Sequence, residues 1–239
     1  MRLFGTLLMA PRTLISLVTL SVAASLAPAQ DAPRSPVLFN PQNAAQLEQD
    51  SRDAWQKPAE VVTFLKLREG DVIADIGTGS GYFVPYLSNS VGSSGRVYAT
   101  DIQPEMLAFV QRKVAELGMN NVTTVLSQEA DTRLNRESVD LAFMVDVYHE
   151  LGSPGSLLSN IRTALKPDGR LTIIDFKADK AADRVGPPLS HRVPKERLIA
   201  EVEQAGFELT ETIELLPYQY FLVFTGKPDA PAATSIGSQ

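Results

Sequence analysis

The sequence predicts a doubly wound α/β fold with a mostly parallel, seven-stranded sheet and a C-terminal antiparallel hairpin. Two observations support this prediction. Short apolar runs typical of buried strands alternate with segments of helical periodicity between residues 58 and 206. The last two strand-like runs, 208–215 and 218–225, are joined by only Leu216 and Pro217, and so short a connection favours an antiparallel pair.

Seven short strands are expected, of which the first, fourth and fifth are largely apolar, as strands covered on both faces are, while the third alternates imperfectly. They span residues 72–76, 97–101, 122–126, 139–145, 171–176, 208–215 and 218–225. Glycine and proline mark the ends of the expected helices, which cover 58–67, 82–91, 104–117 and the segments that follow Pro154 and Pro194. The helix from Pro104 is predicted to bury one face, made of Met106, Leu107, Val110, Val114 and Leu117.

The composition is that of an ordinary globular protein with a negative net charge. Of the 239 residues, 44% are hydrophobic and 21% charged, and the net charge is −6. No stretch is basic enough to follow a nucleic-acid backbone, so no nucleic-acid partner is expected. The absence of cysteine excludes disulfides and thiolate sites, and no spacing of His, Asp and Glu suggests a metal site.

Residues 1–29 have the pattern of a secretory signal peptide. Arg2 and Arg12 flank the start of an apolar stretch, and Ala27-Pro-Ala29 offers small residues for cleavage. Cleavage would remove both arginines and no acid, so the net charge would change from −6 to −8. The mature protein would then be exported, to the periplasm or outside the cell, without a stable membrane span. The alternatives are an uncleaved anchor and a mis-assigned start, which would leave the protein cytosolic.

The rest of the chain divides into three parts. Residues 30–57 are expected to form a proline-rich linker and a helical segment with Trp55, for which packing is the expected role. Residues 58–226 form the predicted ligand-binding domain, and residues 227–239 a disordered tail. Within the domain, the polar segment 177–192 is typical of a lid or specificity loop. The sequence does not predict the oligomeric state.

The stretch 72–83 predicts a ligand site. An apolar strand with Asp75 near its end leads into a turn that contains Gly77, Gly79 and Gly81. Residues without a Cβ let the backbone bend sharply and approach a ligand, and the helix that follows favours an anionic or strongly polar group. The G-x-G-x-G spacing differs from the G-x-G-x-x-G of dinucleotide sites, and such a turn can also simply join a strand to a helix.

An acidic residue at the end of the next strand strengthens the prediction. Asp101 lies twenty residues beyond Gly81. A carboxylate at this place can accept hydrogen bonds from both hydroxyls of a ribose. The turn and the carboxylate together therefore predict a ligand that carries a nucleoside.

Four motifs in the right order resemble the class I S-adenosylmethionine (SAM)-dependent methyltransferases, over residues 58–226. They are Asp75-Ile-Gly77-Thr-Gly79-Ser-Gly81, the run 95–107, the strand 140–146 and the turn 165–171. The resemblance implies a Rossmann-like methyltransferase fold, SAM as cofactor, and a small-molecule or side-chain acceptor that the sequence does not identify. It also implies that the cofactor is bound by Asp75, Gly77, Gly79, Gly81, Asp101, Ile102 and an acid after the third strand, Glu129 or Asp131.

Methyl transfer requires a base only where the acceptor loses a proton. His149 follows the fourth strand, at the end of the sheet where ligand crevices lie, and is the preferred base. Asp146, at the end of the same strand, is the second catalytic candidate, as a contact to the acceptor or to the amino-acid part of the cofactor. His191, in the loop 177–192, could contact an acidic substrate group. The alternatives are solvated histidines without a catalytic role and a helix-capping role for Asp146.

Two other functions stay open. An exported binding module on a methyltransferase fold would explain the predicted signal peptide, because SAM is made and used inside cells. A nicotinamide-dependent oxidoreductase would share the order of strand, glycine turn and strand-end acid.

Overall fold

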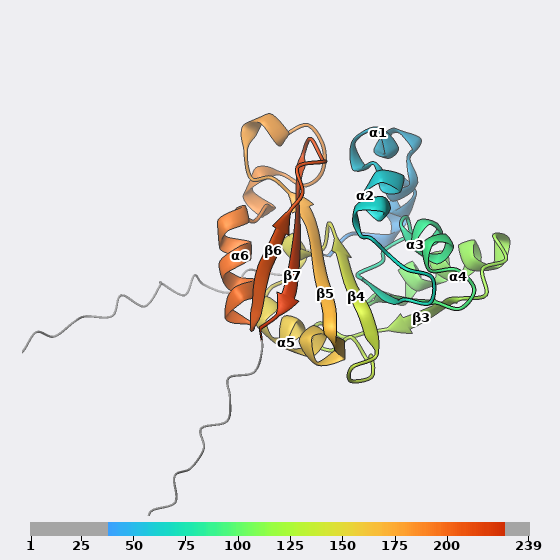
Figure 1. Ribbon diagram of the computed structural model, residues 1–239. Helices are drawn as coiled ribbons and strands as arrows, with labels where there is room; N and C mark the ends of the chain where they lie inside the picture. Colours follow the sequence, from blue (N-terminus) through green and yellow to red (C-terminus); the bar gives the residue numbers. More distant parts are fainter. Residues whose placement is uncertain (1–37, 228–239) are drawn as a thin grey trace, which may run out of the picture. The chain divides into compact units, whose positions relative to one another are not determined.

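The computed structural model describes residues 38–227. The predicted signal peptide, residues 30–37 of the linker segment and residues 228–239 of the predicted tail lie outside the described residues. Within them, a seven-stranded sheet has the order β3-β2-β1-β4-β5-β7-β6 (Figure 1). The strands are β1 Val72–Ile76, β2 Arg96–Asp101, β3 Val122–Leu126, β4 Val139–Val145, β5 Leu165–Phe176, β6 Phe207–Thr212 and β7 Gln219–Gly226.

The pairing of the strands confirms the predicted fold class. Strands β1 to β5 pair in parallel, and β7 is antiparallel to both β5 and β6. The chain leaves β1 for β2 and β3 on one side and then crosses to β4 on the other. This reversal of direction beside β1 is where open α/β sheets form a ligand crevice, outside the carboxyl ends of the strands.

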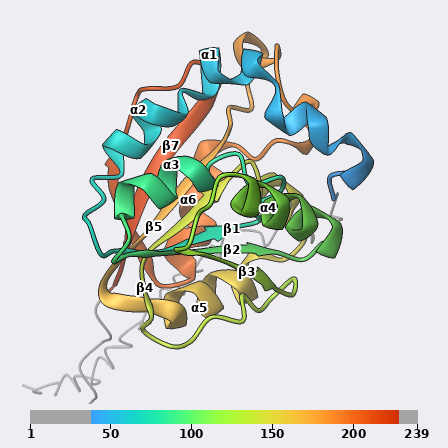
Figure 2. The same ribbon diagram turned by 90° about the vertical axis from the view of Figure 1, so that its right-hand side faces the viewer.

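Helices cover both faces of the sheet (Figure 2). On one face, α2 (Pro58–Phe64) and α3 (Val84–Val91) pack on the strands, and α4 (Pro104–Glu116) lies beside them. On the other face lie α5 (Pro154–Ala164) and α6 (Lys195–Gln204). Side chains alternate along the strands: Phe143 of β4 contacts the first layer and its neighbours Ala142 and Met144 the second. This alternation explains why the strands read as continuous apolar runs.

Short helical turns make up the N-terminal segment and the loops. The N-terminal segment contains η1 (Pro41–Glu48), η2 (Asp50–Arg52) and α1 (Asp53–Gln56). The loop after β4 contains η3 (Tyr148–Glu150), and the loop 177–192 contains η4 (Lys180–Ala182) and η5 (Leu189–His191). No helix in the part of the chain from 38 to 227 has the length and apolar character needed to cross a bilayer.

Three predicted details are wrong. Strand β5 begins at Leu165 instead of at residue 171, because Leu165 pairs with Val139 ahead of a shift in register. Strand β6 ends at Thr212, and the link to β7 is longer than predicted because Ile213 and Leu216 turn into the core. Leu117 is 59% exposed, because α4 ends before it and the chain turns away at Gly118.

Candidate active site

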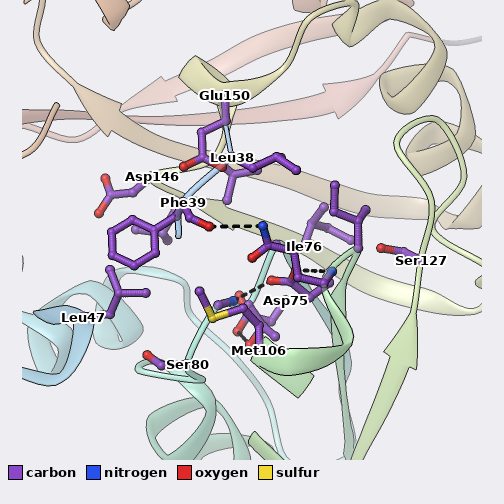
Figure 3. Close-up of a pocket in the computed structure, with 18 of the residues that line it drawn as sticks. Leu38, Phe39, Leu47, Asp75, Ile76, Ser80, Met106, Ser127, Asp146 and Glu150 are labelled. Carbon is purple, nitrogen blue, oxygen red and sulfur yellow. Dashed lines mark hydrogen bonds between the residues drawn. The ribbon is translucent and has the colours of Figure 1, made fainter. Parts of the chain in front are cut away.

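A cavity at the carboxyl ends of β1, β2 and β4 brings together most of the residues predicted to bind a cofactor (Figure 3). We call it the first cavity. Of the predicted residues, it is lined by Asp75, Gly77, Gly79, Asp101, Ile102, Glu129 and Asp146. Gly81, Asp131 and His149 do not line it. Their predicted roles must therefore be judged from other contacts.

The three glycines of the turn are not all required for the same structural reason. All three adopt positive φ, at +67° for Gly77, +54° for Gly79 and +78° for Gly81. A Cβ on Gly77 would lie 2.6 Å from a methyl group of Val147, and one on Gly81 would lie 3.1 Å from a methyl group of Val110. Gly77 and Gly81 are thus constrained by packing, while a Cβ on Gly79 would meet only a Leu47 methyl group in a wall of the first cavity, at 3.3 Å.

Asp101 joins the end of β2 to the glycine turn. Its Oδ2 accepts a hydrogen bond from the Gly79 backbone N–H at 2.9 Å, and its Oδ1 accepts one from the Gln103 N–H at 2.9 Å. Burial raises the pKa of this carboxyl, while the hydrogen bonds from Gln103 and Gly79 lower it. The carboxylate is thus fixed by the backbone at the edge of the first cavity, where a carboxylate suits a ribose.

Asp75 lies beneath the turn and is 4% exposed. Its Oδ2 accepts a hydrogen bond from the Thr78 hydroxyl at 2.6 Å. Burial raises the pKa of Asp75 to about 6, and the hydrogen bond from Thr78 and the distant Arg52 and Lys113 charges offset the shift only in part. Asp75 is therefore a buried acid without a close cationic partner among residues 38–227.

The loop after β3 separates the two acids that the sequence left as alternatives. Glu129 lines the first cavity, on the side of Ser127 and Gln128. Asp131 is turned away, and its carboxylate pairs with Arg133 at 3.2 Å and accepts a hydrogen bond from the Asn160 side chain at 3.3 Å. The geometry thus favours Glu129 as the acid that contacts a ligand.

Asp146, at the end of β4, is held by a buried polar network that the sequence did not predict. Its Oδ2 pairs with the Arg52 guanidinium at 3.1 Å, and its Oδ1 accepts a hydrogen bond from the Gln219 side chain. Gln219 also accepts a hydrogen bond from Gln56 at 2.9 Å. Asp146 has φ of +59°, a conformation that Asp tolerates better than most residues. Burial raises its pKa to about 6, against the opposing effect of Arg52.

The N-terminal segment closes one side of the first cavity. Leu38, Phe39 and Leu47 lie in its wall, and Figure 3 shows Phe39 and Leu47 on the side opposite Ser127. Side chains attach this segment to the glycine turn and to α4. Glu48 accepts a hydrogen bond from the Ser80 hydroxyl and pairs with Lys113 at 2.7 Å, and Asp53 accepts one from the Tyr82 hydroxyl.

A second cavity adjoins the first and has a volume of about 590 Å³. The two cavities share Leu38, Phe39, Leu47, Arg52, Asp146 and Glu150. The second cavity is closed on its other side by Trp55, Phe176 and the loop 177–192, including His191. The predicted specificity loop thus faces a cavity of the size that takes a small molecule.

His149 lines the second cavity and is paired with Asp175, the acid near the end of β5. Its Nδ1 lies 2.8 Å from Asp175 Oδ1, and its backbone N–H donates to Asp175 Oδ2 at 2.9 Å. The side chain of His149 is 9% exposed and that of Asp175 is fully buried. Burial by itself lowers the pKa of His149. The charge and hydrogen bond of Asp175 raise it by more than burial lowers it, and the pKa is about 9.

Comparison with known proteins agrees with this geometry. A family model described as a methyltransferase domain matches residues 74–173. The crystal structure of a SAM-dependent methyltransferase from Aquifex aeolicus is similar with a TM-score of 0.75 and 33% identity, over 78% of this chain and 98% of that one. The chain belongs to the SAM-dependent methyltransferases. SAM is therefore its cofactor, and the nicotinamide alternative loses its support.

Curated relatives are similar over shorter stretches. A protein-L-isoaspartate O-methyltransferase from Fervidobacterium nodosum is 40% identical over 63 residues, which are 26% of this chain and 32% of the relative. A fibrillarin-like rRNA/tRNA 2'-O-methyltransferase from Pyrobaculum neutrophilum is 28% identical over 164 residues, 67% of this chain and 66% of the relative. The chain thus spans about a third and about two thirds of the lengths of these methyltransferases.

The side chains that line the first cavity suit SAM. Gly79 leaves its wall free of a Cβ, Asp101 and Glu129 place carboxylates along it, and Ile102 adds an apolar surface. A carboxylate is the expected partner of ribose hydroxyls, and an acidic surrounding favours a cationic ligand. The roles of single residues in cofactor binding stay predictions, of which Glu129 and Asp101 are best placed.

Proposed function

We propose that the protein transfers the methyl group of SAM to an oxygen atom of a small molecule, with His149 as the base. The observation that carries this proposal is the junction of the two cavities at Asp146, with His149 in the wall of the second cavity and the buried Asp175 paired to it from behind. Both curated relatives described above are named as O-methyltransferases. The net charge of −6 argues against an RNA acceptor.

His149 is arranged for proton transfer. Its Nδ1 contacts Asp175, which fixes the ring and leaves Nε2 as the nitrogen available to the second cavity. Nε2 can accept a proton from the acceptor only while the His149 ring is neutral. The pKa of about 9 therefore means that the base becomes available as the pH rises or as a cationic ligand binds nearby. When bound, SAM supplies a methyl group already activated by the sulfonium. The walls of the cavities align the acceptor and exclude water.

Isothermal titration calorimetry and a product assay test the proposal together. The purified protein is expected to bind SAM, and to release S-adenosylhomocysteine when a panel of hydroxyl compounds is added. His149→Gln is expected to retain SAM binding and to lose transfer by 100-fold or more, in line with the loss of a general base. Absence of SAM binding, or undiminished transfer by His149→Gln, would contradict the proposal.

The predicted signal peptide favours a second candidate, an exported binding module with this fold. Its support is the pattern of residues 1–29 alone. Mass spectrometry of the protein purified from each cell fraction would test it. A chain that begins at Gln30 in the periplasm or the medium and lacks transfer activity would favour the module, whereas an intact cytosolic chain would remove the reason for it.

A further inference from the structure

Part of the wall of the second cavity is aromatic. The ring centroids of Trp55 and Phe176 are 6.0 Å apart with an interplanar angle of 45°, and Trp55 and Tyr218 are 6.4 Å apart. Phe39 contributes a third ring to the lining. Trp55 and Phe176 line the second cavity and not the first, so their faces serve the acceptor side and not the cofactor side. Flat apolar walls of this kind favour a flat apolar guest.

The loop 177–192 forms a fixed wall of this cavity. The guanidinium of Arg192, whose side chain is 1% exposed, donates hydrogen bonds to the carbonyls of Lys177, Ala182, Val185 and Pro187 at 2.7 to 3.1 Å. It also lies 5.3 Å from the centroid of the Phe176 ring. One buried cation thus ties together both ends and the middle of the loop.

Gly186 brings the loop directly against the aromatic wall. It has φ of +79°, and a Cβ at this position would lie 2.4 Å from two ring atoms of Phe176. The backbone of the loop therefore rests on the ring, and no other residue fits there without displacing it. The loop backbone at Gly186 and the ring of Phe176 thus form one continuous part of the cavity wall.

The pair of His149 and Asp175 argues for an acceptor that must lose a proton. Asp175 is fully buried, and its carboxylate accepts hydrogen bonds from His149 and from the Phe176 backbone N–H at 2.7 Å. An amine in its neutral form attacks with its own lone pair, whereas a hydroxyl needs a base. The carboxylates that could attract an ammonium group are compensated, since Asp146 pairs with Arg52 and burial raises the pKa of Glu150 to about 7.

We propose that the second cavity binds a small, flat aromatic compound with a hydroxyl group, a phenol in the broad sense, as the methyl acceptor. This inference rests on the proposed function and names its substrate class. In the step, the hydroxyl proton passes to Nε2 of His149 while the O–CH₃ bond forms. The S–CH₃ bond breaks and its electron pair stays on sulfur, so the sulfonium charge is replaced by that of the imidazolium.

Three compounds with the same fused two-ring carbon skeleton separate the features that recognise the acceptor. 2-Naphthol carries both the ring and the hydroxyl, decahydro-2-naphthol lacks aromaticity, and 2-aminonaphthalene replaces the hydroxyl by an amine. Calorimetry is done with the full chain saturated with S-adenosylhomocysteine, so that binding is measured apart from transfer. 2-Naphthol is expected to bind at least tenfold more tightly than decahydro-2-naphthol, and incubation with SAM should yield 2-methoxynaphthalene by mass spectrometry and no methylated amine.

Two matched variants locate the binding. Trp55→Ala should raise the Kd of 2-naphthol at least tenfold and change the Kd of SAM less than twofold, because Trp55 lines only the second cavity. Phe109→Ala, which removes a ring of α4 that packs on Arg112 and lines neither cavity, should change neither Kd. Equal binding of the two alcohols, methylation of the amine, or an unchanged Kd of 2-naphthol in Trp55→Ala would overturn the inference. Failure of SAM itself to bind would instead overturn the proposed function.

Discussion

Asp175→Asn should lower the pKa of His149 by at least two units. In the native protein, burial lowers this pKa, while Asp175 raises it through its charge and hydrogen bond. Asp146 and Glu150 raise it by smaller amounts, and the resulting pKa is about 9. An asparagine keeps the shape and removes the charge, so burial then dominates and the pKa falls to the ordinary value of 6.5 or below. A decrease of two units corresponds to about 3 kcal/mol.

Nuclear magnetic resonance measures this pKa directly, because the chain contains only two histidines, His149 and His191. Titration of the ring Cε1–H signals gives both values, and His191→Gln assigns them. Asp183→Asn serves as the control, because the side chain of Asp183 is 48% exposed and pairs with Arg192 at 3.5 Å. If the pKa of His149 stayed above 8 in Asp175→Asn, the charge on the ring would come from other groups and the proposed pair would be refuted.

The same pair makes stability depend on pH. The folded pKa of His149 is about 9 and exceeds the ordinary value of 6.5, so the folded state binds the proton more tightly than the unfolded chain. The stabilisation is complete below pH 6.5 and is lost as the pH rises through 9. Urea denaturation should therefore show a stability difference between the native protein and Asp175→Asn that shrinks from pH 6 to pH 10.

Three further predictions concern the first cavity. Gly77→Ala should destabilise the fold by about 2 kcal/mol or more in urea denaturation, since positive φ and the contact with Val147 both oppose a Cβ. Gly79→Ala should destabilise it by only about 1–2 kcal/mol but should also weaken SAM binding, as measured by calorimetry. Asp101→Ala should raise the Kd of SAM by about 10- to 100-fold, the value of a charge-assisted hydrogen bond, and an unchanged Kd would remove its role. The pKa of Asp75 in the folded protein, about 6, exceeds its ordinary value of 3.8, so ionisation of Asp75 destabilises the fold as the pH rises through this range. In urea denaturation, Asp75→Asn should therefore be more stable than the native protein at pH 8 but not at pH 3.5.

The parts of the fold and of the candidate site that follow from a local sequence pattern could be predicted from the sequence. Strands β1, β3 and β4 have the predicted bounds, because each begins and ends with an apolar residue that adjoins a polar residue or a glycine. The polar residues that follow such runs could be placed at one edge of the sheet, because parallel strands end on the same side. This rule located Asp75, Asp101 and Asp146 without knowledge of the strand order.

The same rule also covers Asp175, near the end of β5, although Asp175 is not among the residues predicted above. What it could not show is the partner of Asp175. The register places Val145 of β4 beside Ile174 of β5, which brings the residues that follow the two strands together across 26 positions of sequence. Register depends on the packing of both faces of the sheet and is not visible in either strand alone.

Arg52 could not be predicted for a different reason. It belongs to the segment 30–57, for which the sequence predicts a linker with some helix because prolines and polar residues dominate it. Its guanidinium reaches Asp146, 94 positions away, and lies 4.2 Å from the centroid of the Tyr82 ring. Such contacts depend on where the N-terminal segment crosses the sheet edge, and short 3₁₀ turns give no periodic signal of that path.

The distribution of charge at this edge of the sheet agrees with the proposed roles of the two cavities, the first for SAM and the second for the acceptor. On the acceptor side each strand-end acid has a cation beside it, since Asp146 pairs with Arg52 and the β5 carboxylate with His149. On the cofactor side Asp75 and Asp101 have no cation within ion-pair distance among the described residues, and burial raises the pKa of both. A ligand with a positive sulfonium relieves that deficit, and its charge also disfavours the protonated form of His149. In the proposed reaction, cofactor binding thus prepares His149 to act as the base, which favours an order of binding in which SAM comes first.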